Sequence, residues 1–137
     1  KRAHKVGLSV PNPIYIKNNI LIMEYIGFGS IPAPLLKDIA NPKDPVNLMT
    51  ELLTFIKELY QEAKLVHGDL SEFNILYHNQ KPVVIDISQA VTIHHPKAVV
   101  YLERDITNIC NYFERIGVEV PNREDRLEFY KEVTNID

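Results

Sequence analysis

Three side chains in the middle of the sequence have the types and spacing that phosphoryl transfer requires. Asp69 lies in the segment 67–74, Asn74 follows it by five residues, and Asp86 ends the apolar run 82–85. A carboxylate on a rigid loop can accept the proton of an attacking hydroxyl, and Asp69 fits that role. Magnesium prefers hard oxygen ligands and often takes only one or two from the protein, so Asn74 and Asp86 are its predicted ligands.

Each residue of this segment also has an ordinary structural explanation. A lone Asp or Asn in a loop is usually a cap or a turn residue, and only the joint spacing favours function. Asp86 is expected at the end of a strand, where a buried, unpaired carboxylate is costly without a cation. His67 is predicted to orient the loop through hydrogen bonds, whereas loop capping and substrate contact explain Ser71 and Glu72 equally well.

Short β-rich runs lie on both sides of the motif. Those at 13–17 and 20–25 are joined by two asparagines, which predicts a hairpin. The runs at 75–77 and 83–85 predict a second pair of strands around a turn. The segment 27–32 contains Gly and Pro and is interpreted as an irregular, hinge-like connection.

Apolar periodicity predicts the helices that support these strands. The first begins with the Asp-Pro pair at 44–45, because Asp can cap exposed amides and Pro is tolerated at the first helical position, and it runs to Lys64. The second follows Pro96 and ends at Gly117, and the third begins after Asn122. The predicted buried stripe of the second helix is Val99, Leu102, Ile106, Ile109, Phe113 and Ile116.

Two shorter helical segments are also expected. Residues 1–7 are interpreted as the end of a helix, with basic residues in its last turn and Gly7 as its stop. Residues 34–39 predict a short helix.

Composition limits the class of protein. The 137 residues, 45% of them hydrophobic, suit one domain or one lobe of a larger unit. A net charge of -3 gives no overall attraction to nucleic acid, so charge does not decide whether RNA is contacted. The single Cys110 cannot form an internal disulfide, which favours a reducing, cytoplasmic setting. The longest apolar stretch, 20–28, is interrupted by Glu24 and is too short for a bilayer, so no membrane contact is expected.

The motif also resembles a known family. His67-Gly68-Asp69 with Asn74 resembles the catalytic loop shared by protein-kinase-like folds. The longer strings 67–78 and 85–91 resemble the RIO kinase family of atypical serine/threonine kinases. The resemblance covers most of the chain, and it continues through residues 95–98, 101–105 and 108–113. Residues 70–72 and 87–89 resemble the type-one or type-three branch more than the type-two branch, and we assign a type-one-like chain.

The resemblance implies an α+β, protein-kinase-like fold that binds ATP and Mg²⁺. It implies a kinase or ATPase that acts in maturation of the small ribosomal subunit, with the pre-ribosomal small subunit as a partner. By the same resemblance, Asp69 is the catalytic carboxylate, Asn74 and Asp86 are the metal ligands, and Asp86 is also a candidate phosphate acceptor.

The resemblance further implies a hinge between two lobes. Met23 would line the adenine pocket, while the carbonyl of Glu24 and the amide of Ile26 would meet the adenine edge. Residues 1–26 would then be the end of an amino-lobe helix and a β-hairpin leading to the hinge. Residues 27–137 would be a mainly helical carboxy-terminal catalytic lobe.

The sequence departs from the general kinase pattern in two places. Ile87 and Ser88 follow Asp86 where most kinases have Phe and Gly, and the expected helix start at 95–96 leaves no long activation segment, which favours ATP hydrolysis or autophosphorylation. No glycine-rich loop, strand Lys or helix Glu of the kinase pattern precedes the hairpin. We therefore expect most of an amino-terminal lobe to be missing and this chain alone to show little turnover.

Two other functions stay open beside the RIO-type kinase or ATPase. A small-molecule phosphotransferase of the aminoglycoside or choline kinase type shares the His-x-Asp and Asn pattern, although residues 88–89 and 95–96 argue against it. A non-catalytic nucleotide-binding module that assists assembly of pre-ribosomal particles is the alternative from a different class.

Overall fold

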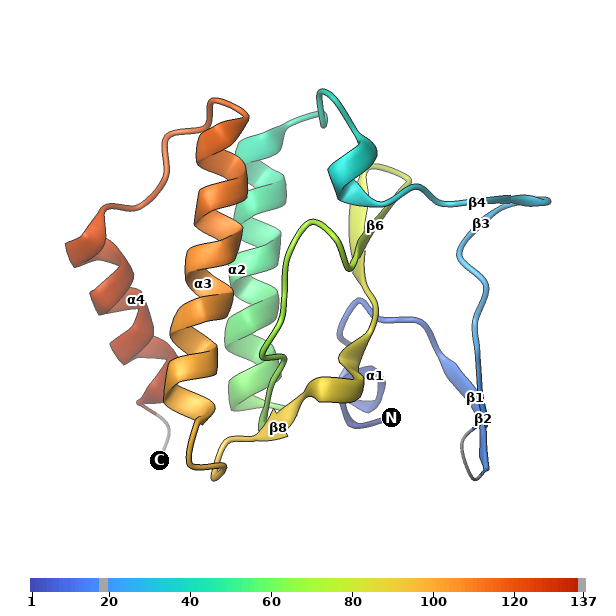
Figure 1. The fold of residues 1–137 in the computed structure, drawn as a ribbon, viewed down its shortest axis with the longest axis horizontal. Helices are drawn as coiled ribbons and strands as arrows, with labels where there is room; N and C mark the ends of the chain where they lie inside the picture. The colour runs from blue at the N-terminus through green and yellow to red at the C-terminus, as the bar shows by residue number, and fades with distance from the viewer. Residues whose placement is uncertain (18–19, 136–137) are drawn as a thin grey trace.

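The computed structural model describes residues 1–17 and 20–135. Long helices pack together on one side of the molecule, and pairs of short antiparallel strands extend from the other side (Figure 1). The helices of the described residues are α1 (Arg2–Lys5), α2 (Pro45–Gln61), α3 (Ala98–Arg115) and α4 (Arg123–Thr134). Single 3₁₀ turns form η1 (Leu36–Asp38) and η2 (Ile87–Gln89). This mixture is the predicted α+β architecture.

The first long helix, α2, begins where the sequence predicts. Asp44 caps it by accepting a hydrogen bond from the Asn47 amide at 3.3 Å, and Pro45 occupies its first position. The helix ends at Gln61, three residues before the predicted Lys64. The apolar face of α2 is buried and consists of Leu48, Met49, Leu52, Phe55, Ile56 and Leu59.

The second long helix, α3, starts at Ala98 rather than directly after Pro96. Ala98, Leu102 and Phe113 are buried, but the prediction that Val99 belongs to the same stripe is wrong, since 54% of its surface is exposed. One residue corresponds to about 100° around a helix, so the line that includes Ala98 leaves Val99 on the flank. The third helix, α4, is capped as predicted: the Asn122 side chain accepts from the Asp125 amide at 2.8 Å.

Two strand pairs confirm the predicted hairpins. β1 (Pro13–Lys17) pairs with β2 (Ile20–Met23), and the predicted turn at Asn18-Asn19 lies outside the described residues. β6 (Ile75–His78) pairs with β7 (Lys81–Val84), with Ile75 opposite Val84.

Two further strand pairs were not predicted. β3 (Gly27–Phe28) pairs with β4 (Ile31–Pro32), so the interpretation of 27–32 as irregular is wrong. β5 (Leu65–Val66) pairs with β8 (Val91–Thr92), which joins the chain before the motif to the chain after Asp86. Each of these strands has two residues, too few to produce an alternating pattern in the sequence.

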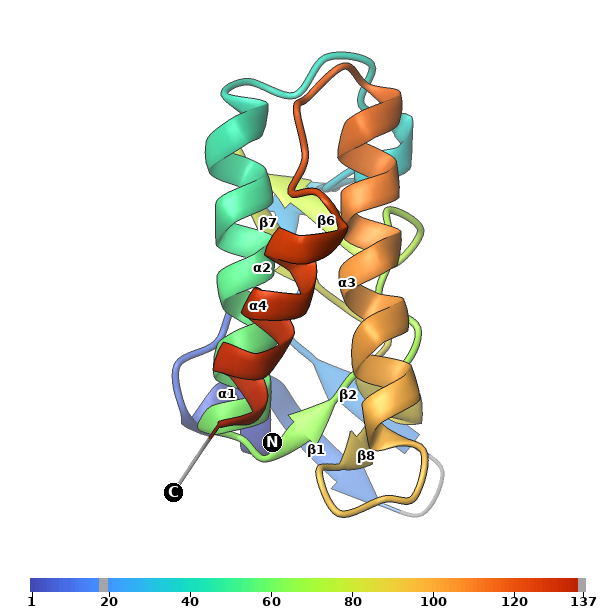
Figure 2. The ribbon, with the colours of Figure 1, turned by 90° about the vertical axis from the view of Figure 1, so that its left-hand side faces the viewer.

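The core lies between α2, α3 and the neighbouring strands. α4 lies across the outer face of α2 and α3, with β6 and β7 behind these helices (Figure 2). Phe113, Leu52 and Ile75 are among the side chains with no exposed surface. No helix in the described part of the chain is both long enough and apolar enough to cross a membrane.

Candidate phosphoryl-transfer site

The predicted motif forms a loop between β5 and β6 that lies along α3. An aspartate of that helix, Asp105, holds the loop backbone: its carboxylate accepts from the Gly68 amide at 2.9 Å and from the Leu70 amide at 3.0 Å. These bonds fix the backbone on both sides of Asp69, while Asp69 itself stays exposed. Burial raises the pKa of the Asp105 carboxyl above its usual value, although the two amide bonds act in the opposite direction.

Sequence reasoning missed Asp105, although a signal was present. The residue lies within the apolar stripe of α3, three positions after Leu102 and four before Ile109, and only 1% of its surface is exposed. An acidic residue in such a stripe must be paired or hydrogen-bonded, because burying an unpaired charge is costly. The position of Asp105 in the stripe therefore indicates that its carboxylate binds another part of the chain.

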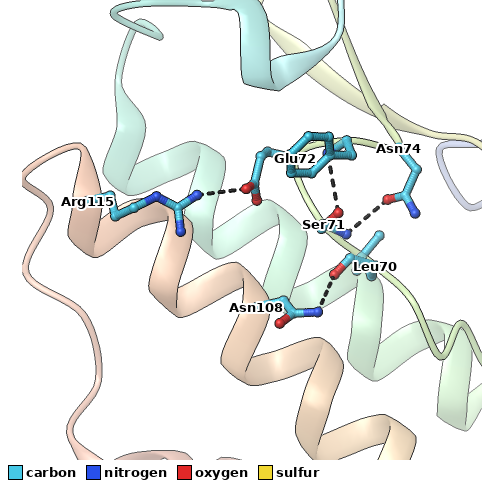
Figure 3. Close-up of polar contacts among 7 residues, drawn as sticks. Leu70, Ser71, Glu72, Asn74, Asn108 and Arg115 are labelled. Atoms are coloured by element: carbon cyan, nitrogen blue, oxygen red, sulfur yellow. Dashed lines mark hydrogen bonds and ion pairs between the residues drawn. The ribbon is translucent and has the colours of Figure 1, made fainter.

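The same face of α3 also binds carbonyl groups of the loop. Arg104 donates to the Gly68 carbonyl, and its guanidinium lies 4.8 Å from the ring centre of Tyr101. Asn108 donates from Nδ2 to the Leu70 carbonyl at 3.3 Å (Figure 3). Both the amides and the carbonyls of the segment around Asp69 are thus held by one helix.

His67 orients the loop, as predicted. It is buried, its Nδ1 accepts from the Asp69 amide at 3.2 Å, and its Nε2 lies 3.3 Å from the Ile85 carbonyl. The tautomer with hydrogen on Nε2 satisfies both contacts. His67 therefore connects the Asp69 backbone to the segment that leads to Asp86.

Asn74 joins the other parts of the site. Its Nδ2 donates to the Asp69 carbonyl at 2.5 Å, and its Oδ1 accepts from the Ser71 amide at 2.9 Å. Its own carbonyl accepts from the Ile85 amide at 2.9 Å. An amide oxygen has two lone pairs, so Oδ1 retains one for the predicted cation.

Asp86 lies two residues beyond β7 and directly after Ile85, whose amide donates to the Asn74 carbonyl. Its carboxylate accepts from the Ser88 hydroxyl at 3.0 Å, and its backbone is left-handed, with φ of 57°. This conformation costs a non-glycine residue about 1–2 kcal/mol. The expectation of a buried charge is wrong: Asp86 is exposed and keeps its hydration, so burial gives no argument for a cation.

A cavity of about 610 Å³ lies beside Asp86, within the size range of small-molecule sites. Met23, α1 and Val84 also line it, whereas Glu24 and Ile26 are not among its lining residues. Met23 is thus placed where an adenine pocket would need an apolar wall.

The backbone around the predicted hinge is partly engaged in other bonds. The Glu24 amide donates to the Asn12 carbonyl at 2.7 Å, and the Ile26 carbonyl accepts from Ala33 at 2.9 Å. These bonds do not use the Glu24 carbonyl or the Ile26 amide, the two groups assigned to adenine. Their adenine contacts stay predictions.

The oxygen atoms of the site fit a magnesium-bound nucleotide. The exposed Asp86 carboxylate and the remaining lone pair of Asn74 Oδ1 are hard ligands, and Mg²⁺ takes its other ligands from water and phosphate. Hydrogen bonds place Asp69, Asn74 and the segment before Asp86 together. The roles of these three residues stay predictions.

Comparison with known proteins identifies the family. The sequence-family model described as the RIO domain matches residues 1–126. The serine/threonine-protein kinase RIO1 of Caenorhabditis elegans is 42% identical over 87% of this chain and 24% of its own length. The RIO-type serine/threonine-protein kinase Rio1 of Methanocaldococcus jannaschii is 40% identical over 100% of this chain and 47% of its own. The serine/threonine-protein kinase RIO3 of Homo sapiens is 37% identical over 86% of this chain and 23% of its own.

Solved structures give the same result for the fold. The Rio2 kinase from Chaetomium thermophilum matches with a TM-score of 0.79 and 27% identity, over 98% of this chain and 43% of that chain. Its ADP/Mg²⁺-phosphoaspartate complex matches with a TM-score of 0.77, 27% identity, and coverage of 98% and 42%. The chain spans less than half the length of these relatives. The RIO1 and RIO3 names agree with the predicted branch. The chain belongs to the RIO domain family and has the protein-kinase-like fold of RIO kinases.

Proposed function

We propose that this chain carries the catalytic loop and metal-binding residues of an atypical serine/threonine kinase or ATPase that uses ATP and Mg²⁺. The observation that carries the proposal is the hydrogen bonding of Asn74, which connects the Asp69 carbonyl to the Ile85 amide beside Asp86. The names of the relatives as serine/threonine kinases support the same reaction class. The chain belongs to the RIO family, and no observation favours an aminoglycoside- or choline-kinase activity.

In this proposal, Asp69 accepts the proton of the attacking hydroxyl or water. Its exposed carboxylate stands on a backbone fixed from both sides by Asp105, so little reorganisation is needed at the reacting end. Asn74 and Asp86 hold the cation through oxygen atoms. The bound Mg²⁺ supplies positive charge that offsets the charge of the phosphates.

Asp86 is also proposed as a phosphate acceptor. One of its carboxylate oxygens bonds to the γ-phosphorus of ATP while the bond from that phosphorus to ADP breaks. Hydrolysis of the resulting acyl phosphate then returns the carboxylate and phosphate. Exposure of Asp86 and the phosphoaspartate named for the Rio2 complex support this step.

The proposal includes an adenine contact at the hinge. Met23 lines the cavity, and the Glu24 carbonyl and the Ile26 amide meet the adenine edge. Residues 1–26 act with an amino-terminal lobe that closes over the phosphates, and residues 27–137 act as the catalytic lobe. Action in small-subunit maturation, in the cytoplasm, extends the same proposal and is supported by resemblance to the RIO family.

Phosphate release by the full-length protein tests the catalytic role. Asp69→Ala is expected to lower the rate by about 10²–10⁴-fold, the usual contribution of a general base, while nucleotide binding survives. The matched control is Asp125→Ala, which removes an exposed carboxylate from the first turn of α4 and is expected to leave the rate unchanged. Unchanged release in Asp69→Ala would refute the assigned role.

A further inference from the structure

The catalytic loop is attached to α3 at two places that lie far apart on the helix. At one end, Asp105 binds the amides of Gly68 and Leu70. At the other end, the Glu72 carboxylate pairs with Arg115, ten residues further along α3 and about 15 Å along its axis. Each end of the loop therefore has its own attachment.

The Glu72 side chain is buried although it lies in a loop, whereas its partner Arg115 has a side chain that is 59% exposed. Glu72 is 9% exposed, whereas the next residue, Phe73, is 65% exposed. The Glu72 Oε1 atom lies 2.7 Å from Nη2 of Arg115 (Figure 3). The main-chain carbonyl of Glu72 accepts from the Lys37 amide at 3.1 Å, so the residue is fixed through both its side chain and its backbone.

Tyr112, on the same helix as Arg115, lies beside the pair. The Arg115 guanidinium lies 5.9 Å from the ring centre of Tyr112. The Tyr112 hydroxyl is buried and has no hydrogen-bond partner within residues 1–17 and 20–135. Burial raises the pKa of Tyr112, and the nearby Glu72 raises it further. The Glu72 carboxylate is shielded from water, whereas the Arg115 guanidinium stays exposed, so salt screens the pair in part.

Glu72 lies in the chain between Ser71 and Asn74, and the hydrogen bonds between those two residues orient the Asn74 side chain. The Asn74 Oδ1 atom accepts from the Ser71 amide, and the Asn74 amide donates to the Ser71 carbonyl at 3.0 Å. A change in the orientation of the Glu72 backbone would displace Ser71 and Asn74 relative to each other. Figure 3 shows Ser71 and Asn74 on one side of Glu72 and Arg115 on the other.

We propose that the Glu72–Arg115 pair is a positioning device for the metal-binding end of the loop, separate from the Asp105 attachment that holds the Asp69 end. It orients Asn74 Oδ1 toward the cation through the Ser71–Asn74 hydrogen bonds. The metal part of this inference rests on the proposed function. Glu72 and Arg115 are positioning residues, because they act through Asn74.

Amide hydrogen exchange in the full-length protein tests the positioning without needing activity. Arg115→Met changes no residue of the loop and removes the guanidinium that pairs with Glu72. The Ser71 and Asn74 amides should exchange faster, while the Gly68 and Leu70 amides keep their protection through Asp105. Unchanged exchange at Ser71 and Asn74, or equal acceleration at all four amides, would overturn the proposal.

The matched control removes a cation from another ion pair. Lys57→Met breaks the Lys57–Glu132 pair between α2 and α4, and the four loop amides should exchange as in the wild type. Arg115→Lys restores a positive charge and should recover part of the protection at Ser71 and Asn74. Faster exchange in Lys57→Met equal to that in Arg115→Met would show a general loss of stability and overturn the proposal.

A magnesium titration of phosphate release separates this inference from the proposed function. Arg115→Met should raise the Mg²⁺ concentration for half-maximal rate by about 10-fold, the usual effect of losing a group that orients a metal ligand. The rate at saturating Mg²⁺ should stay near that of the wild type. An unchanged Mg²⁺ requirement overturns the metal role of the pair. Absence of Mg²⁺-dependent release in the wild type instead refutes the proposed function, and the exchange experiment still decides the positioning.

Discussion

The catalytic loop and the hinge segment are two parts of one candidate site, yet they are built differently. In the loop, His67 and Leu70 are buried and the backbone is bound to α3. Around the hinge, Met23 is 41%, Tyr25 56% and Phe28 66% exposed. Figure 1 shows the loop beside α3 and the β1–β2 and β3–β4 pairs at the far edge of the molecule.

The difference separates the loop, whose backbone this chain fixes by its own hydrogen bonds, from the hinge segment, whose apolar side chains are exposed. Hydrogen bonds to a buried carboxylate resist displacement, because an unpaired partner would stay desolvated. Exposed apolar side chains gain little from their present positions and gain more when covered. We therefore expect substitutions in the loop support to disturb the structure far more than substitutions at the hinge.

The largest expected effect is the loss of stability on substituting Asp105 of the loop support, compared with the loss on substituting Met23 at the hinge. Asp105→Asn places an amide NH₂ against one of two buried backbone amides and should lower the free energy of unfolding by about 2–4 kcal/mol. Met23→Ala, at a side chain 41% exposed, should cost less than about 1.5 kcal/mol. Urea unfolding of the two variants measures both values. Equal losses would remove the distinction between the two regions.

A pair of glycines sharpens the comparison with a smaller effect. Gly68 in the loop and Gly29 in the β3–β4 turn both have positive φ, 88° and 59°. Alanine should cost about 1–2 kcal/mol at each from backbone strain alone. At Gly68 the new Cβ would also lie 3.4 Å from Tyr101, whereas at Gly29 nothing lies within 4 Å. Thermal unfolding should show a greater loss for Gly68→Ala, and a greater loss for Gly29→Ala would contradict the account.

The pH dependence of stability gives the smallest expected effect. Burial raises the pKa of Asp105 above 3.8, so the folded state binds its proton more tightly than the unfolded state. The stabilising contribution of the Asp105 carboxyl is fully present below its unfolded-state pKa of 3.8, and it is lost as pH rises through the raised pKa of the folded state. The stability of the wild type relative to Asp105→Asn should therefore increase as pH falls from about 7 to about 4. Denaturant unfolding at both values checks the sign, and a decrease would be inconsistent with a raised pKa.

The elements that position the site were predictable where local chemistry specifies them. Asp44 with Pro45 begins α2, Asn122 begins α4, and the periodicity of apolar residues predicts the buried faces. The place of His67 in the motif predicts its orienting role. Capping and periodicity act within a few residues, so one sequence contains enough information for them.

The rest depends on contacts between distant residues. Asp105 meets Gly68 across 37 positions of the chain, and no local pattern specifies that contact. The β5–β8 pair depends on the return of the chain after Asp86, and its strands are too short to recognise. The exposure of Asp86 also follows from the tertiary arrangement, so the apolar run before it does not predict whether its carboxylate is buried.

Calorimetry of nucleotide binding to the full-length protein tests the central claim, that Asp86 holds a nucleotide-bound magnesium ion beside the catalytic loop. The account predicts that Mg²⁺ strengthens nucleotide binding in the wild type and in Asp69→Ala. In Asp86→Ala this magnesium-dependent gain in affinity should be lost. A gain in Asp86→Ala equal to that of the wild type would contradict the assignment.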